Sequence, residues 1–410
     1  MADVFLHVGL AKTGTTTIQA ALEARSSQLA DDGVLFAGGS HRAQRLAVYD
    51  LLGQRVKGDD KDVVAGAFER LVDEISAHTG RSVVVSEEEL SLVRPRHVRK
   101  LVRRLAGHRV FVVVGVRDMA RTLVSAWQQS VVTGGVTPWQ HFIESVRDDH
   151  QAVVTSDGVS FWLRHDALRV IDTWRSAVPA ERFRIITVPP SGADSGVLLD
   201  RFARAAELPV GIWESRTVLP RNVSLGVAEL EVVRRLNVAV RDRLDLAQYR
   251  FVVEAGIRPR LRVERSRPLR LPPEHLPWTR LYGERLAAEL RQRGLEIIGD
   301  LSDLFPGDPS GPATPLDVVS DDELLTAAEG VLASLALAHG RLFKRYQRAF
   351  VAREGRWPTA TELIGSRARA TGFRVQKAAL RRADHNRVLA WAARTYLERT
   401  SRTTARNRHP

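Results

Sequence analysis

The loop at residues 9–16, GLAKTGTT, most constrains how this chain can fold. It follows a short apolar run at residues 4–8, which has the length and composition of a buried strand. Apolar residues then recur at helical spacing from Ile18 to Leu29. A strand, a glycine-containing loop and a helix start place backbone N–H groups and the positive end of a helix around an anion. The opening of the chain therefore predicts a phosphate-binding loop.

Further strands are predicted at residues 83–85, 110–114 and 183–188, with helical patterns between them. Strands that alternate with helices are joined by right-handed crossovers and form a mainly parallel sheet with both faces covered. The predicted fold class is therefore α/β, with a P-loop-type sheet flanked by helices. Beyond the sheet, residues 225–240 and 281–295 are predicted helices.

The distribution of charge and proline divides the chain into modules. Four prolines and two glycines between residues 306 and 315 predict a linker over 306–320. The 70 residues from 341 to 410 hold 18 of the 61 Lys and Arg residues but only 4 of the 48 Asp and Glu residues. The sequence thus predicts a domain over 1–305, the linker, and a helical, Arg-rich extension over 321–410.

The basic extension can bind an anionic membrane surface or an anionic polymer, or it can pack as a helical cap on the main domain. It contains no recognisable nucleic-acid-binding motif, so nucleic acid is not an expected partner. The chain has no cysteine, which excludes disulfides and thiolate sites. With no apparent signal peptide or membrane span, the expected location is the cytoplasm, with peripheral membrane contact through the extension.

The loop departs in one position from the usual nucleoside-triphosphate pattern, G-x-x-x-x-G-K-[ST]. Gly9 and Gly14 occupy both glycine positions, but Thr15 stands where that pattern has lysine. The lysine of this loop is Lys12, inside the bend. The displaced cation argues against an ordinary ATPase or kinase. The alternative is a plain strand-to-helix turn with capping threonines.

Residues 12–16 resemble the 5′-phosphosulfate loop of sulfotransferases that use 3′-phosphoadenosine 5′-phosphosulfate (PAPS), and the wider stretch of residues 7–19 is similar to the bacterial, carbohydrate-type branch of that family. Arg117 at the end of a predicted strand, followed eight residues later by Ser125, is similar to the 3′-phosphate site of that family. The resemblance implies PAPS as co-substrate, PAP (3′-phosphoadenosine 5′-phosphate) as product, and no metal. The implied cofactor-binding residues are Lys12, Thr13, Gly14, Thr15, Thr16, Thr17, Arg117, Ser125 and, as a further phosphate ligand or part of an acceptor gate, Arg221.

The resemblance also implies the catalytic residues. Lys12 would stabilise charge on the leaving phosphate, and a glutamate would take the proton from a hydroxyl or amine of a carbohydrate or small-metabolite acceptor. Glu88 is the first choice for this base and Glu87 the second, since both follow the strand at 83–85. Both glutamates could equally form a solvated loop or a first helical turn, where acids are favoured.

Two other functions remain compatible with the sequence. One is a P-loop kinase or nucleotide phosphotransferase, against which the residue at position 15 counts. The other is a non-catalytic protein that uses its basic extension for binding.

Overall fold

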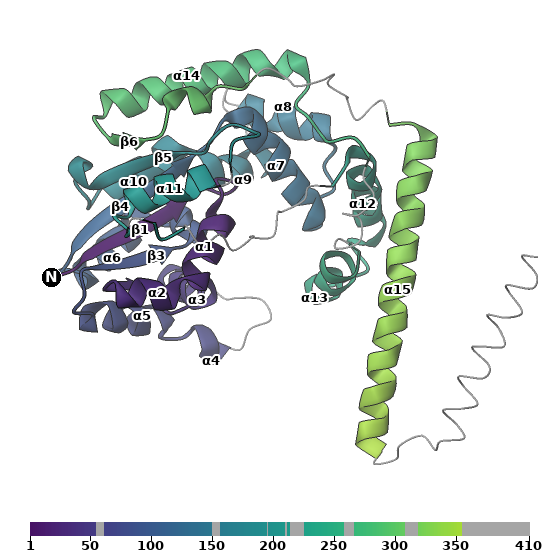
Figure 1. Cartoon of the computed structure of the whole chain (residues 1–410). Coiled ribbons are helices and arrows are strands. Elements are labelled where there is room, and N and C mark those ends of the chain that lie inside the picture. The colour runs from purple at the N-terminus through teal and green to yellow at the C-terminus, as the bar shows by residue number, and fades with distance from the viewer. Residues whose placement is uncertain are drawn as a thin grey trace, which may run out of the picture. The chain divides into compact units, whose positions relative to one another are not determined.

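A parallel β-sheet forms the centre of the main unit (Figure 1). The computed structural model describes residues 1–54, 61–149, 156–194, 196–209, 211–213, 225–257, 266–307 and 319–354. Over these residues the sheet has six strands in the order β2-β3-β1-β4-β5-β6, and every pairing is parallel. The strands are β1 (Asp3–Gly9), β2 (Val34–Phe36), β3 (Ser82–Ser86), β4 (Arg109–Val116), β5 (Phe183–Thr187) and β6 (Glu296–Ile298). The predicted α/β class is confirmed.

The central strands β1, β3 and β4 are buried almost along their whole length. Their valine-rich sequences suit a strand that is covered on both faces, because β-branched side chains pack well on a pleated surface. β1 pairs with β3 and with β4, in registers that place His7 beside Ser86 and Gly9 beside Gly115. The carboxyl ends of these three strands therefore meet at one edge of the sheet.

Helices cover both faces of the sheet (Figure 1). One hydrophobic cluster packs Val98, Trp174 and Leu290 against one face, and another packs Leu22 and Phe202 against the opposite face. The first layer consists of α3 (His41–Leu52), α5 (Ala67–Ala77), α6 (Pro95–Arg104), α10 (Ala167–Arg175) and α14 (Leu276–Gln292); the second consists of α1 (Thr15–Ala24), α2 (Ser26–Asp31) and α11 (Gly196–Ala205).

A further hydrophobic cluster lies beyond the sheet and is centred on Trp127 and Trp139, whose rings are 5.3 Å apart. Trp127 is 1% exposed and donates to the carbonyl of Thr137 (2.9 Å), so it is a core residue here. The elements of this cluster are α7 (Met119–Val132), α8 (Trp139–Asp149), α9 (Ser156–His165), α12 (Val227–Val240), the π-helical segment Arg250–Ile257 and the first part of α15 (Asp321–Glu354).

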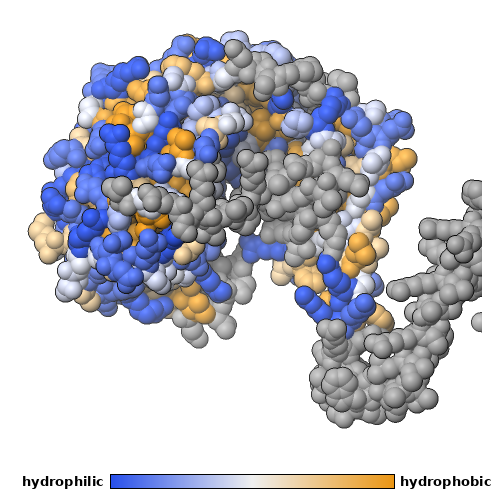
Figure 2. All heavy atoms as spheres, in the orientation of Figure 1, coloured by the Kyte–Doolittle hydropathy of each residue, from blue (hydrophilic) through white to orange (hydrophobic). Residues whose placement is uncertain are grey.

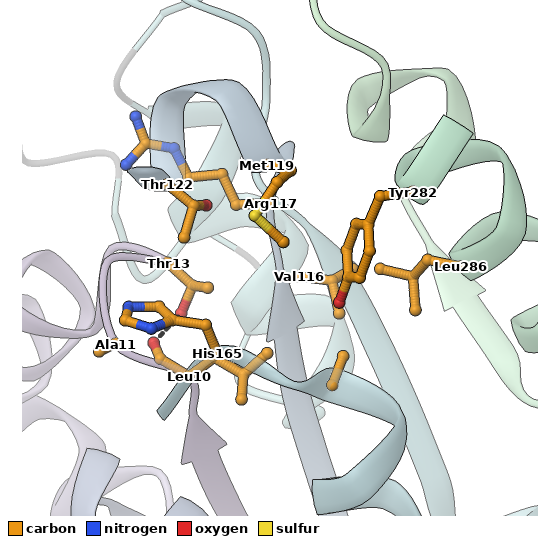
Figure 3. A pocket seen from close by; sticks show the side chains of 11 residues that line it. Leu10, Ala11, Thr13, Val116, Arg117, Met119, Thr122, His165, Tyr282 and Leu286 are labelled. Atoms are coloured by element: carbon orange, nitrogen blue, oxygen red, sulfur yellow. Dashed lines mark hydrogen bonds between the residues drawn. The ribbon is translucent and has the colours of Figure 1, made fainter. Parts of the chain in front are cut away.

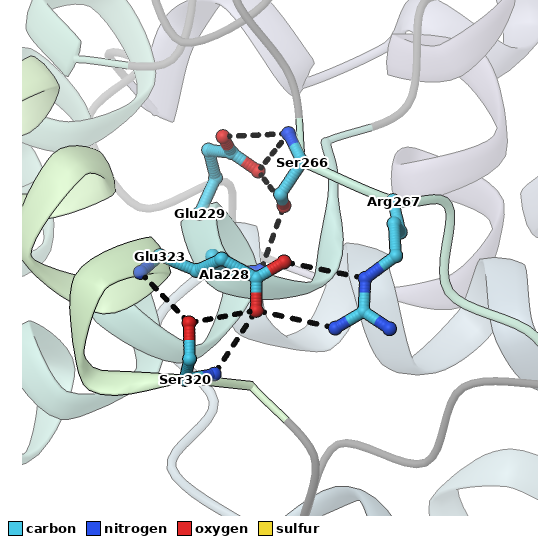
Figure 4. Close-up of polar contacts among 6 residues, drawn as sticks. All are labelled: Ala228, Glu229, Ser266, Arg267, Ser320 and Glu323. Atoms are coloured by element: carbon cyan, nitrogen blue, oxygen red, sulfur yellow. Dashed lines mark hydrogen bonds and ion pairs between the residues drawn. The ribbon is translucent and has the colours of Figure 1, made fainter.

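Polar contacts join three segments around the cluster of Trp127 and Trp139 (Figure 4). The buried carboxylate of Glu229 on α12 accepts from the hydroxyl of Ser266 (2.6 Å), and that hydroxyl in turn accepts from the Ala228 N–H (2.9 Å). Next to them, Arg267 forms an ion pair of 3.2 Å with Glu323 at the start of α15. These bonds fix the beginning of α15 to the rest of the main unit.

Short elements complete the described chain. They are α4 (Lys61–Val64), α13 (Leu246–Tyr249) and the 3₁₀ turns Glu88–Leu92, Ala180–Arg182, Pro273–His275 and Leu301–Leu304. The face seen in Figure 2 is mostly hydrophilic, with small hydrophobic groups between polar residues. No described helix is both long enough and apolar enough to cross a membrane.

The predicted strands at 4–8, 83–85, 110–114 and 183–188 are confirmed, and β2 and β6 were not predicted. The helices predicted at 225–240 and 281–295 are α12 and α14, the second of which begins and ends earlier. The chain divides into two compact units, Met1–Ala336 and Leu337–Pro410. The helix predicted from residue 321 begins there as α15, but its first part belongs to the main unit. Residues 308–318 of the linker and 355–410 of the extension lie outside the described residues.

Candidate active site

The candidate site lies at the carboxyl edge of the sheet. The loop of residues 10–14 leaves β1, Glu87 follows β3 and Arg117 follows β4. Because β3 and β4 lie on opposite sides of β1, their connections run in opposite directions along the sheet. In open α/β sheets, such a point of reversal is where a crevice for ligands forms. The three sequence motifs are therefore brought together by the fold.

The backbone of the loop takes a conformation that few sequences allow. Lys12 has φ 69° and Gly14 has φ 88°, so both are left-handed. Lys12 carries this strain as a non-glycine residue, which is a feature of functional sites. A Cβ on Gly14 would lie 2.3 Å from a methyl of Leu198, and one on Gly9 would lie 2.2 Å from the Thr15 hydroxyl. Gly14 is thus favoured by both its conformation and the space around it, and Gly9 by the space around it.

The threonines of the loop do different things. The Thr13 hydroxyl is buried and donates to the carbonyl of Leu10 (2.7 Å), which closes the loop on itself. Thr15 is 3% exposed, and its hydroxyl is buried without a hydrogen-bond partner. Thr16 is exposed and Thr17 is half-buried, both in the first turn of α1. Thr16 and the N–H groups of this turn therefore offer the accessible donors of the loop.

Lys12 reaches across the site to α7. Its ammonium group donates to the side-chain oxygen of Gln129 over 3.0 Å, a contact between residues 117 positions apart. Gln129 lies one helical turn after the predicted ligand Ser125, which is half-buried on the same helix. Residues four apart share one face of a helix, so the Lys12 ammonium group contacts the same face of α7 that carries the Ser125 hydroxyl.

Arg117 connects the loop to β4. Its Nη1 donates to the carbonyl of Lys12 (2.9 Å), while its Nε is buried without a hydrogen-bond partner. No ion pair to this guanidinium exists among the residues that the structure describes; the neighbouring Asp118 caps α7 and pairs with Arg121 instead. Burial, followed by the charge of Arg121, lowers the pKa of Arg117 to about 10, so it remains cationic at neutral pH. Arg117 is thus a half-buried cation next to the loop, with no carboxylate at ion-pair distance among the described residues.

The two predicted base candidates differ sharply in burial. Glu87 is fully buried, whereas Glu88 is half-buried at the start of a 3₁₀ turn. Burial raises the pKa of Glu87 to about 7, and the guanidinium of Arg45, 3.7 Å away, partly opposes this effect. One oxygen of Glu87 accepts from the N–H of Glu89 (3.3 Å), and the other has no hydrogen-bond partner.

Side chains from three elements hold the end of β3 that carries Glu87. The Ser86 hydroxyl shares a hydrogen bond of 2.8 Å with His7 on β1. The Ser86 carbonyl accepts from Gln19 on α1, and the Ser86 N–H donates to Gln44 on α3, each over 2.8 Å. All of these residues are buried. The position of Glu87 is therefore fixed by a polar network inside the core.

A small pocket lies behind the loop and was not predicted (Figure 3). His165 from α9 approaches Thr13 there, and Tyr282 from α14 lies opposite. The Nδ1 of His165 donates to the carbonyl of Phe161 (2.7 Å), and its Nε2 is buried without a partner. Burial lowers the pKa of His165 to about 4, and the nearby charge of Lys12 contributes in the same direction. The imidazole is thus neutral at physiological pH.

The predicted residues 12–17, Glu87, Glu88, Arg117 and Ser125 all lie in the main unit around this edge of the sheet. Arg221 lies outside the described residues. Among the described residues, no group of three or more His, Asp or Glu side chains is arranged to hold a metal ion. The sequence did not point to Gln129, His165 or Arg45. His165 and Arg45 are far from the motifs along the chain, and Gln129, although four residues after Ser125, shows its role only through its contact with Lys12, 117 positions away.

A solved structure of known function is weakly similar to this chain. No protein-family model matches the chain, and no curated protein matches it. A crystal structure of a sulfotransferase from Alicyclobacillus acidocaldarius is similar with a TM-score of 0.33 and 13% identity, over 60% of this chain and 98% of that one. Similarity at this level does not establish a shared function, so the residues of the site must carry any assignment.

Proposed function

We propose that the protein is a PAPS-dependent sulfotransferase that acts on a hydroxyl or amine of a carbohydrate or small metabolite. The observation that carries the proposal is the half-buried Arg117, which contacts the loop backbone through Nη1, has a buried Nε without a hydrogen-bond partner, and forms no ion pair among the described residues. Burying a cation without a partner is costly, and a bound phosphate would compensate for it. A loop that suits one phosphate and an arginine that suits a second match the two phosphates of PAPS.

Lys12 and the start of α1 would meet the 5′-phosphosulfate. In sulfuryl transfer, the acceptor oxygen or nitrogen forms a bond to sulfur while the bond from sulfur to the phosphate oxygen breaks. Negative charge therefore grows on the phosphate oxygen that leaves. Lys12, inside the bend and half-buried, can stabilise this charge together with the N–H groups of the helix start.

Glu87 is the better candidate for the base, which reverses the order that the sequence favours. A base must accept the acceptor's proton and be deprotonated at the working pH, and it is most effective when its pKa is near that pH. Burial raises the pKa of Glu87 to about 7, and one of its oxygens has no hydrogen-bond partner. Glu88 is half-buried at the edge of the same turn and stays the alternative.

The structure gives a physical reason to prefer this function over a kinase. A kinase-type loop places a lysine at position 15 to meet the phosphates. Thr15 is 3% exposed, and its hydroxyl lies against Gly9 inside the loop. The cation is instead Lys12, held by Gln129 on the side of Ser125 and Arg117.

Calorimetric titration with PAP in the presence of EDTA tests the proposal. The protein should bind PAP, and Arg117→Ala should weaken binding at least tenfold, since a charge-assisted pair to a phosphate is lost. Arg204→Ala, which removes an exposed arginine from α11, should leave PAP binding unchanged. Adenosine 5′-phosphosulfate, which lacks the 3′-phosphate, should bind both the native protein and Arg117→Ala with similar, weaker affinity. If the native protein binds ATP with magnesium but not PAP, the proposal is wrong.

A further inference from the structure

Helix α6 has an unusually basic outer face. Its ten residues, PRHVRKLVRR, contain five exposed Lys and Arg residues, and Arg94 just before it is exposed as well. No Asp or Glu occurs between Glu89 and Asp118. By contrast, residues 1–340 as a whole hold 43 basic and 44 acidic residues. The positive charge of α6 therefore stands out against a nearly neutral main unit.

Only one side of this face is neutralised. Lys100 lies 3.8 Å and Arg104 lies 2.6 Å from the carboxylate of Glu69 on α5. Arg96, Arg99 and Arg103 have no ion pair among the residues that the structure describes. We call these three arginines the α6 stripe.

The pKa of His97, which lies on the inner side of α6, is consistent with a positive field. Burial lowers this pKa, and Arg96, Arg94 and Lys100 lower it further. A cluster of like charges of this kind destabilises the protein slightly and suits an anionic partner.

The stripe is straight and faces away from the core. Arg96, Arg99 and Arg103 follow one another at intervals of three and four residues, so they share one side of the helix. Val98 and Leu101 lie on the opposite side and are buried. With a rise of 1.5 Å per residue, the three arginines extend over about 10 Å. This is the geometry of a track for an extended chain with repeated negative charges.

The stripe follows the candidate base closely along the chain. The 3₁₀ turn Glu88–Leu92 follows Glu87 directly, and α6 begins at Pro95. The helix starts at the carboxyl edge of the sheet, because it follows β3 and leads back to the amino end of β4. A chain bound along the stripe can thus continue into the acceptor side of the site.

We infer that the α6 stripe binds an anionic polysaccharide, whose carboxylate or sulfate groups pair with the three arginines while one of its hydroxyls or amines is presented to Glu87. This inference rests on the proposed function. Arginine suits such groups because its planar fork binds a carboxylate or sulfate through two hydrogen bonds. A lipid surface fits the stripe less well, since none of the large hydrophobic residues exposed in the described chain belongs to α6. A polysaccharide also carries the hydroxyl that sulfuryl transfer requires.

Fluorescence anisotropy with labelled polygalacturonate and labelled heparin tests the inference directly, because it does not depend on turnover. Arg99→Gln/Arg103→Gln should weaken binding of at least one polysaccharide about tenfold at low salt and make its affinity less dependent on salt. The matched control, Arg25→Gln/Arg204→Gln, removes the same charge from the side of the sheet covered by α1 and α11. It should retain native affinity. PAP binding, measured by calorimetry, should be unchanged in both variants.

The two hypotheses can fail separately. If the native protein binds PAP but neither polysaccharide, or if both double variants lose affinity equally, the α6 stripe is not an acceptor surface. If it binds a polysaccharide through the stripe but not PAP, the proposed function is wrong and, with it, the acceptor role. Equal, stripe-dependent binding of a DNA duplex or of phosphatidylserine vesicles would identify a general anion-binding surface and overturn the inference.

Discussion

Arg45 should control the pH at which the proposed enzyme becomes active. Its Nε lies 3.7 Å from the buried Glu87 carboxylate, and its own side chain is 41% exposed. The charge of Arg45 favours the ionised carboxylate, so Arg45→Gln should raise the pKa of Glu87 above its value of about 7. Turnover that depends on ionised Glu87 should then begin at a higher pH.

The size of this change follows from Coulomb's law. At the distance of 3.7 Å, two unit charges interact by about 1 kcal/mol in water and by about 4 kcal/mol at an effective dielectric of 20. Because Arg45 is partly exposed and screened by salt, the lower figure applies, which corresponds to about one pH unit. Turnover at pH 6.5 should fall roughly eightfold, and turnover at pH 9 should change little.

The assay is kcat/KM for PAP formation between pH 5.5 and 9.5, with Arg42→Gln as control, because Arg42 is an exposed arginine on the same helix. The control should keep the native midpoint. An unchanged or lowered midpoint in Arg45→Gln would refute the reasoning. A midpoint near 7 that persists in active Glu87→Gln would show that another group titrates.

Three further predictions concern stability and the loop. The unfolded state releases the Glu87 proton near pH 4.5, whereas the native state keeps it until about pH 7, so the free energy of unfolding should fall as the pH rises from 4.5 to 7. Glu87→Gln should flatten this slope in thermal melts recorded against pH. Gly14→Ala should weaken PAP binding at least tenfold in calorimetry, because its φ of 88° and the Leu198 methyl 2.3 Å from a new Cβ exclude the native loop; native affinity would contradict this. Ser266→Ala removes the hydroxyl donor from the buried Glu229 carboxylate and leaves the backbone N–H donor in place, so it should cost about 1–3 kcal/mol in urea unfolding without changing PAP affinity.

The sequence predicted the long strands because their apolar runs are unambiguous. β1, β3 and β4 each contain several consecutive buried residues. β2 and β6 have three residues each, too few for a periodic pattern to appear, and they exist because a neighbouring strand offers its edge. The start of α15 was predicted at residue 321, but its attachment to the main unit depends on Arg267, 56 positions away.

The phosphate loop could be predicted because its glycines and lysine lie close together in sequence. The choice between Glu87 and Glu88 could not, because both follow the same strand and differ in burial alone. That burial depends on Gln19 and Gln44, which hold Ser86 from two separate helices. The contact between Lys12 and Gln129 on α7 also joins residues far apart in the sequence, so the sequence alone could not predict it.

The hydrogen bond from Arg117 to the Lys12 carbonyl joins the two proposed phosphate sites before any ligand arrives. The left-handed conformation of Lys12 costs on the order of 1–3 kcal/mol, and the folded protein already bears this cost. Binding of a two-phosphate ligand therefore requires little ordering of the loop, and this preorganisation favours affinity. A mimic that bridges both sites with one rigid scaffold would share this advantage, whereas two separate fragments would each have to overcome their own loss of rotational and translational freedom.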